Sequence, residues 1–186
     1  EGKINYIGLS NFAAWQYMKA VGVTKYNNYA PIACIQPMYS LLKRQCESEI
    51  LPMSYSEGLG VFSYSPLGGG VLTGKYLKQD KNNEEGRLNK MAMYKKRYQD
   101  EKHMRIAENF TDYARSRDIN PISLAISWVE ANKAITAPII GGRSVEQLRP
   151  SLDSIDIVMD EEMYNDLSLM ADGPETATDR SEERSD

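Results

Sequence analysis

The chain has 186 residues, of which 41% are hydrophobic, and it carries a formal net charge of −4 with a pI near 5.2. This size and apolar content suffice for one domain with a core, whereas the acidic balance argues against binding to nucleic acid or an anionic membrane. No apolar run is long enough to span a bilayer, no signal peptide is recognisable, and two cysteines make no disulfide framework. We therefore expect a cytoplasmic protein.

Short apolar segments alternate with helical patterns along the chain. We predict strands at residues 4–9, 30–36, 60–64 and 134–140, the last of them fully buried. We predict helices at residues 13–21, at 40–56 with an interruption at Pro52, at 99–118, from the start signal Asn120-Pro121, from Ser144, and from the cap Asp160.

Two segments show neither pattern. Residues 77–96 are polar with no clear period, and a loop of that length in a compact domain is usually functional or disordered. The chain after Gly173-Pro174 is polar and charged. We therefore predict one domain over residues 1–171 and a polar, disordered tail over residues 172–186.

The order of the elements predicts an α/β fold. A strand followed by a helix, repeated four times, indicates a parallel sheet covered by helices. An open doubly wound sheet and a (β/α)8 barrel both fit, and four units make half of a barrel. In both folds ligands bind at the carboxyl ends of the strands, where this chain has Ser10-Asn11, Gln36, residues 64–67 and residues 141–143.

Gly141-Gly142-Arg143 lies between a predicted strand and a predicted helix. Glycine allows close backbone approach, and both the helix N-terminus and the arginine favour an anion. A phosphate site and an ordinary strand-to-helix loop with a surface arginine are both compatible with this stretch alone.

Four motifs occur in register along the chain: IGLSNF at residues 7–12, QPMY at 36–39, YSPL at 64–67 followed by Gly74-Lys75, and IGGR at 140–143 followed by Gln147. Their order and spacing together resemble the aldo-keto reductase family, over nearly the whole chain. The long loop after the third strand resembles the branch that includes potassium-channel β subunits and aflatoxin-aldehyde-type reductases.

This resemblance implies a (β/α)8 TIM barrel of which the chain supplies about the last four βα units, with residues 1–171 as the carboxyl-terminal half. It implies an NADP-dependent oxidoreductase that reduces small aldehydes or ketones, with this chain carrying the cofactor-binding half. A nucleotide-sensing regulatory subunit with little turnover is the alternative, and a degenerate cofactor-binding half-barrel is a third. We expect neither a nucleic acid nor a membrane as a partner. The resemblance is compatible with a protein that forms oligomers.

The resemblance also assigns binding roles. Ser10, Asn11 and Gln36 would hold the nicotinamide carboxamide, and Tyr64 would stack on the nicotinamide. The pyrophosphate would be clamped by Ser65, Pro66, Leu67, Gly69 and Lys75, with Arg87 closing over it. The adenosine end would meet Gly141, Arg143, Gln147 and Ser151, and Arg143 would meet a 2′-phosphate, which favours NADP over NAD. The chain departs from the family pattern at Arg149-Pro150-Ser151.

The family's catalytic Asp, Tyr, Lys and His lie on its first four strands, and this chain begins just before the fifth. We therefore assign no catalytic residue and no metal ligand here. We expect the native chain to extend upstream of Glu1, and we expect the 186 residues alone to be inactive. His103 lies among charged residues in a predicted helix and is expected at the surface.

Overall fold

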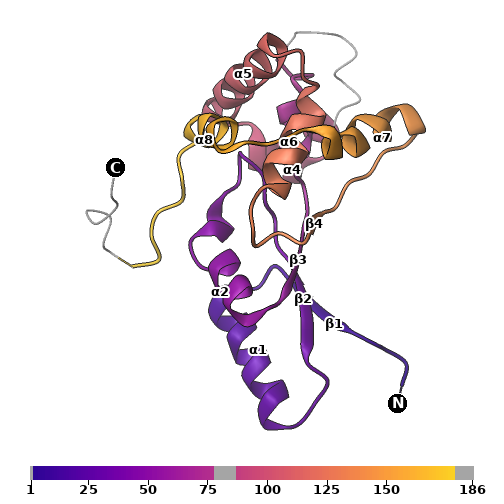
Figure 1. The fold of residues 1–186 in the computed structure, drawn as a ribbon, viewed down its shortest axis with the longest axis vertical. Helices are drawn as coiled ribbons and strands as arrows, with labels where there is room; N and C mark the ends of the chain where they lie inside the picture. Colours follow the sequence, from indigo (N-terminus) through magenta and orange to yellow (C-terminus); the bar gives the residue numbers. More distant parts are fainter. Residues whose placement is uncertain (1, 78–86, 179–186) are drawn as a thin grey trace.

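The structure, a computed structural model, describes residues 2–77 and 87–178, without the side chains of Arg87 and Asn89. Its centre is a four-stranded parallel sheet (Figure 1) made of β1 (Ile7–Ser10), β2 (Ile32–Gln36), β3 (Gly60–Ser63) and β4 (Ala137–Pro138). The strands pair in the order β1-β2-β3-β4. This order confirms the predicted α/β fold. It also favours a barrel, because a doubly wound sheet reverses its strand order at a switch point.

The strands are shorter than predicted. β1 begins at Ile7, and the preceding Ile4 and Tyr6 are exposed. The prediction of a fully buried strand at 134–140 was wrong, since β4 has two residues and both are half-buried. Pro138 has no N–H for a ladder hydrogen bond, and this shortens the strand. Pairing with β3 continues on either side, through Thr136 N to Val61 O and Ile139 N to Ser63 O.

Eight α-helices and three 3₁₀ turns are formed by the described residues. The α-helices are α1 (Ala14–Tyr26), α2 (Ile50–Glu57), α3 (Arg87–Lys90), α4 (Ala92–Tyr98), α5 (Glu101–Ser116), α6 (Pro121–Glu130), α7 (Val145–Leu152) and α8 (Glu161–Leu169). The turns are η1 (Gln45–Glu47), η2 (Gly68–Thr73) and η4 (Asp153–Asp156). The predicted caps are confirmed, because the side chains of Asn120, Ser144 and Asp160 each accept a backbone N–H of the first turn.

Two helix predictions were wrong. Residues 40–49 form turns and η1 rather than the first half of a helix, and α2 begins only at Ile50. Pro52 is then the third helical residue, where a missing N–H breaks no intrahelical bond. Within the segment 77–96, which was predicted as a loop, α3 and α4 are helical. Residues 78–86 lie outside the described part of the chain.

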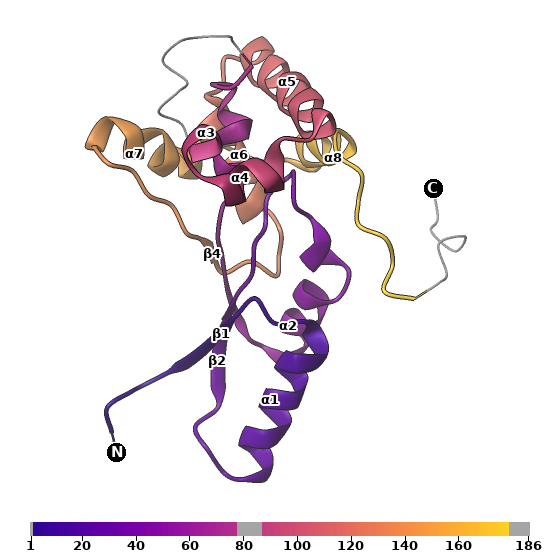
Figure 2. The same cartoon turned by 180° about the vertical axis from the view of Figure 1, so that it is seen from behind.

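The helices divide into two groups. Helices α1 and α2 lie beside the sheet at one end of the molecule, and α4 to α8 gather at the other (Figures 1 and 2). The core links both groups, and its largest fully buried side chains include Tyr17, Tyr39, Tyr98, Phe110 and Trp128. Among the described residues, no helix combines the length and the apolar character needed to cross a membrane.

The carboxyl end of α8 is held by a half-buried charge pair. The Arg44 guanidinium donates to both carboxylate oxygens of Glu47 at 2.9 Å, and its Nη1 donates to the carbonyls of Ser168 and Ala171. Tyr39 also donates to Glu47, at 2.7 Å. The guanidinium therefore adds hydrogen bonds to the Ser168 carbonyl at the end of α8 and to the Ala171 carbonyl just beyond it.

Candidate functional site

The carboxyl ends of β1, β2 and β3 form one polar surface. Ser10 pairs with Gln36 in the sheet register, and its Oγ donates to the Gln36 carbonyl at 2.8 Å. The Tyr64 hydroxyl donates to Asn11 Oδ1 at 2.6 Å. Ser10, Asn11 and Gln36 are exposed and Tyr64 is half-buried, so these four predicted site residues are close together and reachable by a ligand.

Asn11 is held in the left-handed region, with φ 58°. Asparagine tolerates this conformation better than most residues, because its short amide forms local hydrogen bonds. The turn directs the chain from β1 into α1 and leaves the Asn11 side chain beside Tyr64. An amide with donor and acceptor atoms in this position is suited to pair with another amide.

Tyr17 supports the same surface and was not predicted. It is fully buried in α1, and its hydroxyl accepts the Phe12 backbone N–H at 3.4 Å. Burial raises the pKa of Tyr17, so its phenol is neutral at pH 7. A buried helical tyrosine is ordinarily interpreted as a core residue, and the sequence carried no signal that its hydroxyl would reach the segment after β1.

The residues after β3 form a turn with unusual backbone geometry. Ser65 has φ 60°, and Gly68, Gly69 and Gly70 have φ of 56°, 67° and 90°. Leu67, at φ −88° and ψ 8°, directly precedes left-handed Gly68. A right-handed residue followed by a left-handed one turns successive N–H groups toward one side, as in anion-binding concavities. In this turn Gly68 N and Gly70 N already donate to the carbonyls of Ser65 and Leu67, both at 2.9 Å.

Lys75 lies beside this turn. A Cβ added at Gly70 would lie 3.0 Å from Lys75 Cε and Nζ, so the end of the lysine side chain lies against the Gly70 backbone, whose φ of 90° favours glycine. The ammonium also lies 4.9 Å from the centre of the Tyr76 ring. The turn thus brings together the Lys75 ammonium, the Gly70 backbone and the strained Ser65. Such an arrangement is suited to hold a phosphate group.

The residues predicted for the adenosine end lie elsewhere, on the loop after β4 and on α7. Gly141, Arg143 and Gln147 are exposed, and Arg143 N donates to Gln147 Oε1 at 3.1 Å. Ser151 is buried, and its carbonyl accepts from Ser154 Oγ at 2.9 Å. Within the described part of the chain, no hydrogen bond or ring contact joins this group to the strand-end residues. Arg87 opens α3, and its side chain lies outside the described residues.

Tyr39, the last residue of the QPMY motif, and His103 lie in environments that shift their pKa values. Tyr39 is fully buried, and burial together with Glu47 raises the pKa of its phenol far above the ordinary value, so this group does not serve as an acid at neutral pH. His103 was predicted at the surface and is half-buried instead, 6.0 Å edge-on to the Tyr98 ring. Burial lowers the pKa of His103, and nearby Lys43 lowers it further.

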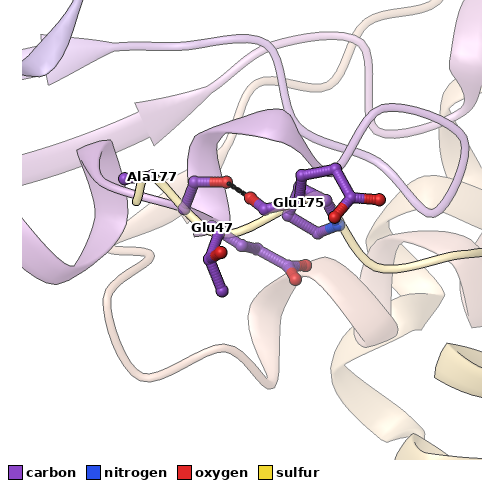
Figure 3. A pocket seen from close by; sticks show the side chains of 6 residues that line it. Glu47, Glu175 and Ala177 are labelled. Atoms are coloured by element: carbon purple, nitrogen blue, oxygen red, sulfur yellow. Dashed lines mark hydrogen bonds between the residues drawn. The ribbon is translucent and has the colours of Figure 1, made fainter. Parts of the chain in front are cut away.

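A separate cavity lies beside Glu47, the carboxylate that accepts from Tyr39. It has a volume of about 290 Å³ and lies between Glu47-Ser48 and residues 174–177 (Figure 3). Ser48 Oγ donates to the Glu175 carbonyl at 2.7 Å across it. This bond attaches residues 174–177 to the segment around Ser48. In the described chain, no group of three or more His, Cys, Asp or Glu is placed to hold a metal ion.

The fold and the site define a parallel α/β protein with a left-handed, glycine-rich turn and a lysine after its third strand. The family model described as Aldo/keto reductase family matches residues 1–171. The chain belongs to this family, which confirms the resemblance seen in its four motifs.

Curated relatives agree with this assignment. The chain is 38% identical to the Bacillus subtilis protein named uncharacterized oxidoreductase YrpG, over 93% of this chain and 51% of that protein. It is 31% identical to norsolorinic acid reductase A of Aspergillus parasiticus, over 89% of this chain and 40% of that protein. It is 34% identical to aflatoxin B1 aldehyde reductase member 2 of Rattus norvegicus, over 82% of this chain and 45% of that protein. The chain therefore spans about half the length of the curated relatives it matches.

Proposed function

We propose that the chain is the cofactor-binding half of an NADPH-dependent reductase that converts aldehydes or ketones to alcohols. The observation that carries this proposal is the turn at residues 65–70. Its left-handed backbone and the adjacent Lys75 are suited to a pyrophosphate, next to a strand-end surface suited to a carboxamide. NADPH, when bound, would supply the hydride that reduces the carbonyl carbon.

Each residue group has a defined task in this proposal. Asn11 and Gln36 present amide groups and Ser10 a hydroxyl, which together offer donors and acceptors to the carboxamide. Tyr64 presents a half-buried ring at the same surface. Lys75 and the turn neutralise the pyrophosphate, and exposed Arg143 offers a planar fork to a 2′-phosphate. The printed names of two relatives, norsolorinic acid reductase and aflatoxin B1 aldehyde reductase, support a reductase over a purely regulatory subunit.

Proton donation to the substrate is assigned to residues outside this chain, in the other half of the barrel. The family's catalytic Asp, Tyr, Lys and His belong there, and we therefore expect the 186 residues alone to bind cofactor without turnover. The exposed apolar residues of the sheet support a missing half: Ile7, Phe62 and Ile139 are 36%, 38% and 42% exposed. Exposed Trp15 and Val23 line an apolar groove on the outer face of α1 and offer a further contact.

The test uses the whole gene product that contains this chain. NADPH and NADH are titrated by nicotinamide fluorescence, and NADPH oxidation is followed with a panel of aldehydes and ketones. Tight NADPH binding with carbonyl-dependent oxidation supports the reductase. NADPH binding without turnover on any carbonyl would favour the nucleotide-sensing alternative. Absence of binding would refute the proposal and leave a degenerate barrel half.

A further inference from the structure

Tyr64, the tyrosine assigned to the nicotinamide, depends for its position on the segment that follows β2. It comes directly after β3, and both of its backbone groups bond to that segment. Tyr64 N donates to the Pro37 carbonyl at 2.9 Å, and the Tyr64 carbonyl accepts Tyr39 N at 3.2 Å. After Tyr64 the extended backbone ends, because Ser65 has φ 60°. The place of the Tyr64 ring is therefore set by where residues 37–39 lie.

The side chain of Tyr39 anchors this segment in the interior. Tyr39 is fully buried, and the centre of its ring lies 5.2 Å from that of Trp128 in α6. Its hydroxyl donates to Glu47 Oε1 at 2.7 Å and accepts from Asn132 Nδ2 at 3.2 Å. The hydroxyl thus joins the segment after β2 to η1 and to the loop between α6 and β4.

Both partners of this hydroxyl are themselves fixed. Arg44 donates to the two carboxylate oxygens of Glu47 at 2.9 Å, and the Glu47 side chain is only 18% exposed. A hydrogen bond to a charged group is stronger than one between neutral groups. Asn132 is held as well, because its Oδ1 accepts Ala134 N at 3.0 Å. The Tyr39 hydroxyl is therefore bound by two side chains that each have a further bond of their own.

We propose that Tyr39 is a positioning residue for the nicotinamide end of the cofactor site, on which it acts through Tyr64. The inference rests on the proposed function and extends it to a fully buried residue. Packing against Trp128 accounts for the Tyr39 ring, which a phenylalanine would keep. The hydroxyl has a different effect, because its two bonds fix the backbone that pairs with Tyr64. Asn11 is affected in turn, since the Tyr64 hydroxyl donates to its Oδ1.

The experiment compares the whole gene product with its Tyr39→Phe variant by calorimetric titration, at a temperature where circular dichroism shows both proteins folded. Two ligands are used: NADPH, and 2′-phospho-ADP-ribose, which has the adenosine and pyrophosphate groups but no nicotinamide. Loss of the hydroxyl is expected to weaken NADPH binding by about three- to tenfold. Binding of 2′-phospho-ADP-ribose is expected to stay unchanged.

A second background makes the test specific to Tyr64. The Tyr64→Ala variant lacks the ring that Tyr39 is proposed to position, so it is expected to bind NADPH more weakly by itself. Adding Tyr39→Phe to Tyr64→Ala is then expected to cause no further loss, because a residue that acts through another has no effect once that other is gone. A further loss as large as that in the parent background would overturn the proposal.

The Tyr113→Phe variant is the matched control. It also removes a tyrosine hydroxyl bond, to Asp166 at 3.2 Å where α5 meets α8, and it is expected to bind both ligands as the parent does. Parent-like NADPH binding by Tyr39→Phe, or equal weakening of both ligands, would overturn the inference alone.

If the Tyr39→Phe protein does not fold, Asn132→Ala takes its place, because it removes one of the two partners of the hydroxyl. Its NADPH binding is expected to weaken by a smaller factor, again without an effect on 2′-phospho-ADP-ribose, and the same two results would overturn the inference. If the parent itself binds no NADPH, the proposed function has failed and the inference falls with it.

Discussion

The Tyr64 hydroxyl donates to Asn11 Oδ1 at 2.6 Å, across 53 positions of the chain. The bond joins the end of β3 to the turn that follows β1, with the end of β2 between them. Because the Asn11 oxygen accepts from Tyr64, the amide nitrogen of Asn11 is oriented to donate elsewhere. The bond therefore holds the carboxyl ends of β1, β2 and β3 together as one surface.

Replacing Tyr64 with phenylalanine tests this bond. The ring stays, so stacking on a nicotinamide stays, but Asn11 loses the donor that orients it. We expect NADPH affinity to fall by about 0.5–1.5 kcal/mol, measured by fluorescence titration. Tyr26→Phe is the control, because Tyr26 is 89% exposed at the far end of α1. A Tyr64→Phe variant that binds as tightly as the parent would contradict the assignment.

Arg143→Ala tests the choice between NADPH and NADH. Arg143 is exposed at the start of α7, and a charge-assisted contact to a 2′-phosphate is worth about 1.5–3 kcal/mol. We expect NADPH affinity to fall by about tenfold or more, with NADH affinity unchanged. The control Arg115→Ala removes an exposed arginine from α5. Equal losses for both nucleotides would place Arg143 away from the 2′-position.

Gly69→Ala tests the conformation of the turn. The new methyl group would meet Tyr94 Cδ1 at 2.8 Å, and φ of 67° is unfavourable for alanine. We expect the free energy of unfolding to fall by about 1–3 kcal/mol in urea titrations. Gly22→Ala is the counterpart, because nothing lies within 4 Å of that Cβ. Gly22 lies within α1, so its replacement should stabilise the protein by about 0.5–1 kcal/mol.

Arg44→Met tests the attachment of α8. The substitution leaves the Glu47 carboxylate, whose side chain is 18% exposed, without its cation. It also removes both hydrogen bonds to the carbonyls of Ser168 and Ala171. Breaking a buried pair in this way is expected to cost about 3 kcal/mol of unfolding free energy. Arg115→Met breaks an ion pair that is 72% and 63% exposed, and it should cost less than about 1 kcal/mol.

His103 should make stability depend on pH. Burial and Lys43 lower its pKa below the ordinary value of 6.5, while Asp100 acts in the opposite direction. Its Nδ1 is buried, and no hydrogen bond to it is formed by the residues that the structure describes. The unfolded state therefore takes up the proton more readily, and the contribution of His103, which is full above pH 6.5, is lost as pH falls through the folded-state pKa. Comparing urea unfolding at pH 7.5 and pH 5 should show a smaller pH effect in His103→Gln than in the parent.

The architecture was predictable because it depends on patterns that the sequence carries locally. Apolar runs between helical segments predicted four strands, and caps such as Asn120 and Asp160 marked helix starts correctly. Residues 40–56 were mispredicted because the apolar pattern there is satisfied by turns, with Leu41 and Leu42 buried before any helix begins. Helix α4 was missed because it is short, contains the charged run Lys95–Arg97 and buries only Tyr98, so it shows no helical apolar period.

The site residues that lie within the sequence motifs could be predicted. Asn11 and Tyr64 were named from the sequence, and the structure brings them into contact. Tyr17, which supports the site from behind, could not be named from the sequence although it lies only five positions after Phe12. A burial pattern describes such a residue only as core, and the contact of its hydroxyl with the Phe12 N–H is seen only in the folded chain.

The order of the sheet also constrains how the protein is made. Every strand pairs with its immediate predecessor in the chain, so each βα unit can be added to the one already formed while synthesis continues. The contacts of Arg44 with α8 are different, because they span 124 and 127 positions. On the ribosome these contacts must wait until α8 has emerged from the exit tunnel. The attachment of α8 therefore forms later in biogenesis than the pairing of the four strands.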